Sequence, residues 1–205
     1  MSKNENFTEK KMINLKSGDL YKPLLKERLS EKRYVHSLAV ADEAVRLAEK
    51  YGADIQKAYI AGLLHDITKN ADKQEHFGIF TAYGIALTDV EKSAEKLWHA
   101  ISGSAYVKHF LNIEDGEICE AIRYHTTARA GMSLLEQVLY LADFTSADRD
   151  YDDVDVMRKL VDEDLDKALV YALRYTIEEL IAKGAPIHPD TVSAYNEVIL
   201  KGKTV

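Results

Sequence analysis

The stretch "AGLLHDITKN", residues 61–70, places a histidine directly beside an aspartate inside an apolar run. Both side chains are costly to bury unless other groups pair with them. Apolar residues recur here at the i, i+3, i+4, i+7 spacing of a helix face that packs into a core: Ile60, Leu63, Leu64 and Ile67. This spacing predicts one helix that begins after an Asp54 N-cap and ends at about Asn70.

His65, Asp66 and Lys69 fall together on the opposite face of that predicted helix, because successive residues are about 100° apart. The preceding turns of the same face carry small residues, among them Ala58 and Gly62. A glycine inside a helix costs about 1 kcal/mol relative to alanine, so its presence indicates a steric reason. We therefore expect a second helix to pack closely on this face, and the polar residues to lie in a confined place.

The helical period extends over most of the 205 residues, and glycine (10) and proline (3) are scarce, as expected for an all-α protein. The predicted helices cover residues 19–29, 30–52, 54–70, two short segments within 72–98, 99–112, 114–126, 133–147, 153–162, 165–183 and 190–201. No repeat or linker is evident. The sequence predicts one helical bundle over residues 19–205, preceded by a mobile N-terminal arm over residues 1–18.

The composition restricts the partners that we expect. A formal net charge of −7 disfavours a general nucleic-acid binder, although a local basic pocket for a small anion remains compatible with it. The polar residues 1–18 lack the apolar core of a signal peptide, and no apolar run is long enough to span a membrane. The single Cys119 suits a reducing compartment. We expect a cytoplasmic protein without a nucleic-acid polymer or a membrane as partner; a homodimer is left open.

Three further helices place a polar residue where an apolar stripe would continue. Asp143 follows Leu135 and Leu139, His125 follows Ile118 and Ile122, and His36 shares an edge with Val40 and Leu47. One such residue alone is more often a core residue whose hydrogen bonds are satisfied than a metal ligand. Four helices that each deliver a histidine or an aspartate to a buried face predict a metal site. Imidazole and carboxylate ligands suit Fe, Mn²⁺ and Zn²⁺, and the lack of cysteine disfavours a closed structural zinc site.

The order of these residues resembles that of the HD-domain metal-dependent phosphohydrolases, whose pattern is H…HD…D. Here it is formed by His36, the pair His65 and Asp66, and the distant Asp143. The segments "RYVHSLAV", "AGLLHDITK", "LWHAISG", "AIRYHTTARAGMSLLEQVLYLADFTSADR" and "PIHPDT" are similar to the YqeK-type branch, the symmetrical diadenosine tetraphosphate hydrolases. This resemblance covers roughly residues 20–200. It implies cleavage of the tetraphosphate bridge at its centre, with two ADP as products and iron as the metal; manganese or zinc would also fit.

The resemblance also assigns roles to residues. It implies that His36, His65, Asp66 and Asp143 bind the metal, and that Asp66, Lys69 and His125 act in catalysis. His99 and His125 are expected to contact phosphate rather than a second metal, although a second site there stays open. The residues implied in substrate binding are His65, Asp66, Lys69, His99, His125, Thr126, Asp143, Arg149, His188, Asp190 and Thr191. Arg149 and the segment "IHPDT" are expected to line one nucleotide pocket.

Two features depart from this pattern or fall outside it. Ala128, in "TTARAGM", stands where a glycine is expected from the family. This difference concerns the geometry of the loop and none of the expected metal ligands. The acidic stretch 148–166 is interpreted as helix caps and a solvated surface, and His76 as a surface residue.

Two alternative functions remain open from the sequence. The metal ligands alone do not select the substrate, so another nucleotide or a cyclic dinucleotide is an alternative. A non-catalytic nucleotide sensor that retains the metal is the other. Lys69 argues against the sensor, because a structural metal site needs no cation that faces phosphate.

Overall fold

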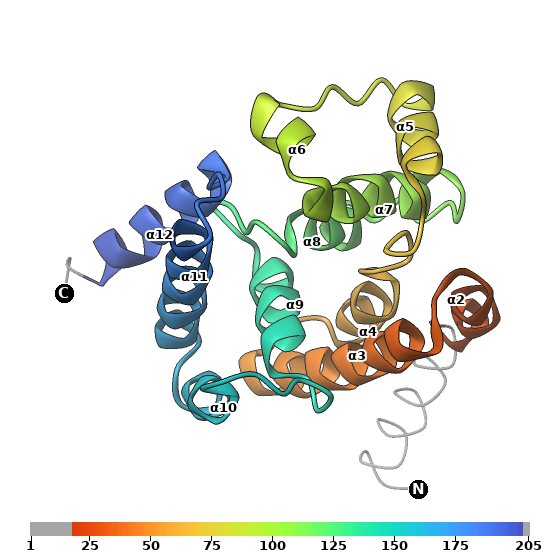
Figure 1. The fold of residues 1–205 in the computed structure, drawn as a ribbon. Helices are drawn as coiled ribbons and strands as arrows, with labels where there is room; N and C mark the ends of the chain where they lie inside the picture. Colours follow the sequence, from red (N-terminus) through yellow and green to blue (C-terminus); the bar gives the residue numbers. More distant parts are fainter. Residues whose placement is uncertain (1–17, 203–205) are drawn as a thin grey trace, which may run out of the picture.

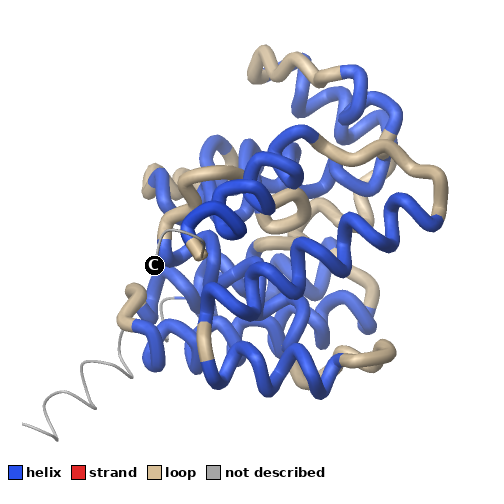
Figure 2. Tube along the Cα trace, turned by 90° about the vertical axis from the view of Figure 1, so that its left-hand side faces the viewer, coloured by secondary structure: helices blue, strands red, loops and turns tan. Residues whose placement is uncertain are grey.

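The computed structural model describes residues 18–202 and is helical throughout, with no strand in that range (Figures 1 and 2). The predicted arm over residues 1–18 therefore lies outside the described residues, apart from Gly18. In chain order the helices are η1 (Asp19–Tyr21), α2 (Lys22–Arg28), α3 (Glu31–Tyr51), α4 (Ile55–Leu64), α5 (Lys73–Ala82), α6 (Asp89–Ser93), η2 (Glu95–Leu97), α7 (Trp98–His109), α8 (Gly116–Tyr124), α9 (Leu134–Thr145), α10 (Val154–Glu163), α11 (Leu165–Ala182) and α12 (Pro189–Lys201). The predicted all-α class is confirmed.

Capping residues set the limits of the central helices. The Ser30 side chain accepts a hydrogen bond from Arg33 N and begins α3. Gly52 ends α3 with φ of 83°, a left-handed conformation that glycine adopts without strain. The Asp54 side chain accepts from Lys57 N and begins α4, as predicted.

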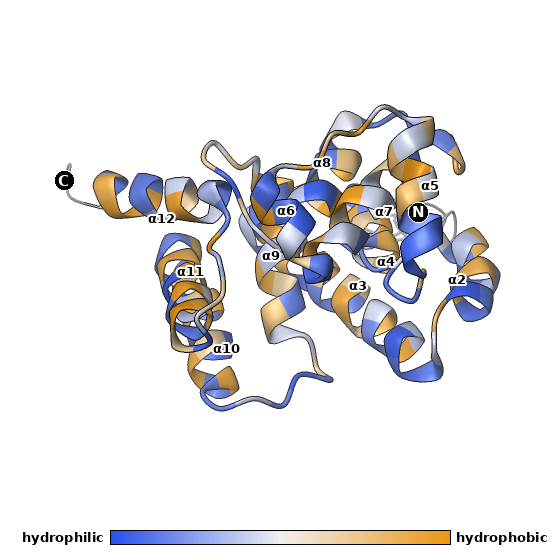
Figure 3. Ribbon diagram, turned by 45° about the horizontal axis from the view of Figure 1, so that its top comes forward, coloured by the Kyte–Doolittle hydropathy of each residue, from blue (hydrophilic) through white to orange (hydrophobic). Residues whose placement is uncertain are grey.

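Helix α9 lies at the centre of the molecule, between α3 and α4 on one side and α11 on the other (Figure 1). A single large hydrophobic core contains buried residues from Leu25 in α2 to Ala194 in α12. Hydrophobic and hydrophilic residues are mixed along the helices (Figure 3), and the buried hydrophobic residues form this core. Phe80, Trp98 and Ile101 form a smaller cluster between α5 and α7. Among the described residues, no helix is long and apolar enough to cross a bilayer.

Helices α3 and α4 approach each other at the small residues noted in the sequence. A Cβ atom added to Gly62 would lie 2.6 Å from Ala41 Cα and 3.0 Å from Ala41 N, so no side chain fits there. The expectation of a closely packed partner helix is therefore confirmed. This contact fixes the end of α4 against α3.

The predicted continuation of α4 to Asn70 is wrong, because the helix ends at Leu64. Successive turns follow, in which Ile67 N donates to Leu64 O (3.1 Å) and Lys69 N to Asp66 O (2.8 Å). The ring Nδ1 of His65 donates to Gly62 O (2.7 Å) and so occupies the carbonyl that Asp66 N would bond in a helix. His65 and Asp66 thus lie on a turn whose side chains are not restricted to one helix face.

Candidate functional site

The four predicted metal ligands converge from three parts of the chain. His36 lies on α3, His65 and Asp66 lie on the turn after α4, and Asp143 lies on α9. Two overlapping groups have ligand atoms that all lie within 4.8 Å of one another: His36, His65 and Asp143, and His65, Asp66 and His125. His36 Nε2 is 3.0 Å from Asp143 Oδ1, and His65 Nε2 is 3.6 Å from Asp66 Oδ2. The arrangement places histidine and carboxylate atoms where they could share one ion.

Three of these imidazoles are held by their Nδ1 atoms, which leaves Nε2 facing the cluster. His65 Nδ1 donates to Gly62 O (2.7 Å), and His125 Nδ1 donates to Ile122 O (2.7 Å). His36 Nδ1 donates to Asp148 Oδ2 (2.8 Å). Metal-ligating histidines are typically oriented in this way.

His65 Nε2 supplies the most direct test of whether a metal fits. The residue is fully buried, and this atom has no hydrogen-bond partner among residues 18–202. An orphaned buried nitrogen is costly, and a metal ion at the cluster would satisfy it. The donor set therefore fits the divalent metal that the imidazole and carboxylate pattern indicates.

The electrostatics favour the metal-binding protonation states of His65, His125 and Asp66. At His36 burial lowers the pKa, but the hydrogen bond to Asp143 outweighs it and the pKa is raised. Burial lowers the pKa of His65, and burial together with His65 and His99 holds the pKa of His125 well below its ordinary value. Burial opposes the ionised form of Asp66, but His65 and a hydrogen bond from His99 outweigh it and hold that pKa well below normal. Neutral imidazoles and ionised carboxylates are the forms that ligate a cation.

Asp148 belongs to this site, which corrects the interpretation of the acidic stretch as caps and solvated surface alone. Its carboxylate accepts from His36 Nδ1 and, through Oδ1, from Ser146 Oγ (2.8 Å). Asp164, in the same stretch, is a helix cap as expected, because it accepts from Lys167 N (2.9 Å). Sequence spacing could not separate the two aspartates, since only the fold brings Asp148 beside α3.

We expect Asp148→Ala to weaken metal binding by roughly 10- to 100-fold, because His36 loses the partner that fixes its orientation. A chelator-competition titration of the purified protein measures this affinity. Asp155→Ala is the matched control, since Asp155 lies in the same acidic stretch with a side chain that is 92% exposed. Equal metal dissociation constants for the two variants would contradict a supporting role for Asp148.

Lys69, His99 and His125 extend the cluster on the Asp66 side. His99 Nε2 lies 3.1 Å from Asp66 Oδ1 and 3.1 Å from His125 Nε2. Lys69 Nζ lies 3.0 Å from His99 Nε2 and 3.6 Å from Asp66 Oδ1. A cavity of about 470 Å³, the Lys69 cavity, is lined by Arg33, Lys69, Ala71, Lys73, His76, Glu95, Lys96 and His99. Its excess of cations suits a phosphate chain.

Two lining residues of the Lys69 cavity differ from expectation. Arg33, which the sequence reasoning missed, places NH1 3.1 Å from Asp66 Oδ2. The signal available was its position one turn before His36 on the same helix. His76 is buried rather than on the surface, because it packs against Phe80 and Trp98 and bonds Ser102 Oγ through Nδ1 (2.8 Å).

The residues expected in one nucleotide pocket lie in two separate cavities. Arg149 lines a cavity of about 390 Å³, the Arg149 cavity, together with Lys32, Arg33, His36, Asp148, Asp150 and Tyr151. Its guanidinium pairs with Asp143 and lies 3.5 Å from His36 Nε2. Thr126, His188 and Thr191 line a different cavity of about 460 Å³, the His188 cavity. The expected grouping of Arg149 with "IHPDT" is therefore wrong, since Arg149, in the segment after α9, and His188 and Thr191, at the start of α12, line different cavities.

The His188 cavity contains unsatisfied polar groups. Thr126 Oγ1, Thr127 Oγ1 and His188 Nε2 are buried without a hydrogen-bond partner in the described part of the chain. Glu91 Oε1 is 3.6 Å from His188 Nε2, beyond hydrogen-bond distance, and Asp190 Oδ2 is 3.5 Å from His188 Nδ1. Asp190 does not line the cavity but donates its backbone N–H to His188 Nδ1 (3.2 Å). Three orphaned groups at one cavity are costly unless water or a ligand supplies their partners.

Ala128 adopts φ of 55°, so its position does require the left-handed conformation that a glycine would provide. The loop nevertheless closes, because Ala128 N donates to Tyr124 O (2.8 Å) and Thr191 Oγ1 donates to Thr127 O (2.7 Å). The alanine at position 128 therefore does not disrupt the loop beside His125.

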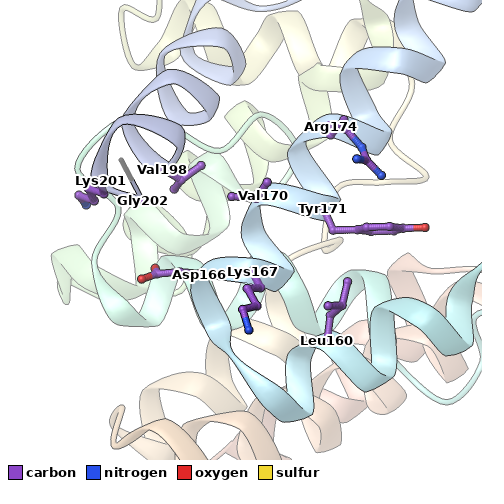
Figure 4. Close-up of a pocket in the computed structure, with 9 residues that line it drawn as sticks. All are labelled: Leu160, Asp166, Lys167, Val170, Tyr171, Arg174, Val198, Lys201 and Gly202. Atoms are coloured by element: carbon purple, nitrogen blue, oxygen red, sulfur yellow. The ribbon is translucent and has the colours of Figure 1, made fainter. Parts of the chain in front are cut away.

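A further cavity lies between α10, α11 and α12, away from these residues (Figure 4). Its volume is about 440 Å³, and its walls include Leu160, Val170, Tyr171 and Val198. No predicted site residue lines it. Volume alone therefore does not identify the functional cavity.

Comparison with known proteins identifies the family. The HD-domain family matches residues 33–148. A relative from Bacillus subtilis named "Bis(5'-nucleosyl)-tetraphosphatase, symmetrical" is 39% identical over 175 residues, which cover 85% of this chain and 94% of the relative. The chain belongs to the HD-domain family, in the branch of the symmetrical bis(5'-nucleosyl)-tetraphosphatases. The resemblance inferred from the sequence is thereby confirmed.

Two further proteins are similar to this chain over nearly its whole length. A protein of the same name from Halalkalibacterium halodurans is 39% identical over 180 residues, covering 88% of this chain and 96% of that protein. A crystal structure from Clostridium acetobutylicum, described as a "predicted HD superfamily hydrolase involved in NAD metabolism", has a TM-score of 0.86 at 41% identity. It covers 89% of this chain and 97% of its own. The helical HD-domain fold thus extends over nearly the whole chain.

Proposed function

We propose that this HD-domain hydrolase cleaves diadenosine tetraphosphate at the centre of its bridge, with two ADP as products. The observation that carries the proposal is the pair of overlapping groups of possible metal ligands, His36, His65 and Asp143 and His65, Asp66 and His125, beside a cavity lined by cations. Relatives that are 34–39% identical to the chain are named symmetrical bis(5'-nucleosyl)-tetraphosphatases. We also propose a cytoplasmic location, on the ground that Cys119 is a free thiol.

The metal is proposed to be iron, held by His36, His65, Asp66 and Asp143. Bound there, it would act as a Lewis acid and lower the pKa of a coordinated water molecule. Asp66 is suited to orient the attacking water as well as to bind metal, because both of its oxygens have polar neighbours in the cluster. Arg149 pairs with Asp143 at Oδ1, the same oxygen that His36 Nε2 approaches.

His99 and His125 are proposed to contact phosphate rather than a second metal. The Lys69 ammonium lies 3.0 Å from His99 Nε2, so a second cation at that nitrogen would be repelled. A phosphate oxygen would instead be attracted by Lys69, and its negative charge would favour a protonated His125, whose Nε2 could then donate a hydrogen bond to it. Lys69, His125 and Arg149 together would stabilise the charge that develops on the phosphates.

One nucleoside is proposed to occupy the His188 cavity. Thr126, Thr127 and His188 offer it hydrogen-bonding groups that lack partners in the described structure. Glu95 and Lys96 line both this cavity and the Lys69 cavity, so one ADP half of the substrate can extend from the nucleoside to the metal ligands. Asp190 would position His188, which its backbone N–H contacts.

A substrate panel separates this function from its alternatives. The protein is reconstituted anaerobically with iron and assayed with diadenosine tetraphosphate, a cyclic dinucleotide and ATP. We expect diadenosine tetraphosphate to be turned over with the highest kcat/KM. A higher kcat/KM for the cyclic dinucleotide would contradict the proposal, and tight binding of diadenosine tetraphosphate without turnover would favour the sensor.

A further inference from the structure

The three cavities around the metal ligands follow one another in a fixed order. The His188 cavity shares Glu95 and Lys96 with the Lys69 cavity. The Lys69 cavity in turn shares Arg33 with the Arg149 cavity. The proposed metal-ligating residues lie between the Lys69 cavity and the Arg149 cavity, because His99 lines the first and His36 lines the second. A substrate molecule that begins in the His188 cavity would pass the proposed metal-ligating residues and then enter the Arg149 cavity.

We propose that the Arg149 cavity binds the second half of the dinucleotide, and that it does so through the phosphates with little contact to the base. This inference rests on the proposed function, because cleavage at the centre leaves an equal half on each side of the reacting phosphorus. The first half fills the His188 and Lys69 cavities. The second half then requires a space on the His36 side of the cluster.

The charges of the Arg149 cavity suit phosphate. Its cations are Lys32, Arg33 and Arg149, and its acids are Asp148 and Asp150. Asp148 is already bonded to His36 and Ser146, while the two arginines pair with Asp66 and Asp143. Lys32 is exposed and forms no ion pair within residues 18–202, so its ammonium is available to a ligand.

The same cavity offers little that could recognise a base. No Ser, Thr, Asn or Gln lines it. Its single aromatic residue, Tyr151, donates its hydroxyl to Phe144 O (3.2 Å), and its ring packs against Phe144 and Tyr175. The His188 cavity, by contrast, contains three orphaned polar groups. The two halves of a symmetrical substrate would therefore be held in unlike ways.

A consequence is that the second nucleoside is dispensable. Adenosine 5'-tetraphosphate keeps the phosphates and lacks that nucleoside, so it should be cleaved to ADP and pyrophosphate. In this reaction a water oxygen bonds to one central phosphorus and the bridging oxygen leaves with the other half. One molecule of water is consumed, and the protons of that water go to the products or to solvent.

The test compares these two substrates in the iron-loaded protein and in Lys32→Met. We expect adenosine 5'-tetraphosphate to have a kcat/KM within about tenfold of that of diadenosine tetraphosphate. Lys32→Met should raise KM for both substrates by roughly threefold to tenfold, as for one partly exposed charge pair. This effect should shrink at high salt. The dissociation constant of ADP should not change, because ADP prefers the His188 cavity.

Lys108→Met is the matched control, because Lys108 is an exposed lysine that lines none of the three cavities. Identical KM values for Lys32→Met and Lys108→Met would overturn the assignment of the second half to this cavity. A kcat/KM for adenosine 5'-tetraphosphate that is more than about a hundredfold lower would show that the second base is recognised. No turnover of diadenosine tetraphosphate by the unmodified protein would instead reject the proposed function itself.

Discussion

Replacing either His36 or Asp143 by alanine is expected to remove most of the metal from the protein and with it nearly all activity. Each variant leaves an incomplete ligand set, and Asp143→Ala also leaves His36 Nε2 without its neighbour at 3.0 Å. Loss of Lewis-acid catalysis worth several kcal/mol should lower kcat/KM by about a thousandfold or more. Elemental analysis of the purified proteins measures the metal content per chain.

His109→Ala is the control for the histidine variant, since His109 is an exposed residue near the end of α7 that stacks on Tyr83. It should retain the metal. Circular dichroism of each variant distinguishes loss of the metal from loss of the fold. Equal metal occupancy in the unmodified protein and in both ligand variants would show that the proposed metal site is wrong.

Lys69→Met should lower kcat/KM by on the order of 10- to 200-fold while the metal content stays the same. The variant keeps most of the apolar stem and removes a charge-assisted phosphate contact worth roughly 1.5–3 kcal/mol. The Lys69 ammonium lies within 3.6 Å of both His99 Nε2 and Asp66 Oδ1, where the reacting phosphates are proposed to bind. Steady-state kinetics with diadenosine tetraphosphate measure the effect.

Lys92→Met provides the comparison for Lys69→Met. Lys92 is 61% exposed, pairs with Asp89 on α6 and lines none of the cavities beside the metal ligands. Its replacement should leave kcat/KM unchanged. If Lys69→Met behaved in the same way, Lys69 would be a surface residue without a role in catalysis.

The helices and the ligand cluster could be predicted because both depend on local pattern. The apolar period locates α3, α4, α8 and α9, and a polar residue that interrupts such a stripe must meet a partner in the core. His36, His125 and Asp143 each stand out in this way. Gly62 indicated a close helix contact for the same reason, since its cost inside a helix needs a steric cause.

The remaining features depend on contacts between distant segments. The end of α4 at Leu64 follows from the ring of His65, which occupies Gly62 O and replaces a backbone donor. Asp148 reaches His36 across 112 positions of sequence, and nothing in its acidic surroundings marks it. The separation of Arg149 from the "IHPDT" segment likewise depends on how α9 and α12 are placed, which their own sequences do not specify.

The position of the cleaved bond tests the central claim most directly. The metal-loaded protein is incubated with diadenosine tetraphosphate in H₂¹⁸O, and the earliest products are separated and weighed by mass spectrometry. We predict ADP as the sole early product, with solvent oxygen in one ADP of each pair. Early appearance of ATP and AMP in equal amounts would contradict symmetrical cleavage, even if the metal assignment were correct.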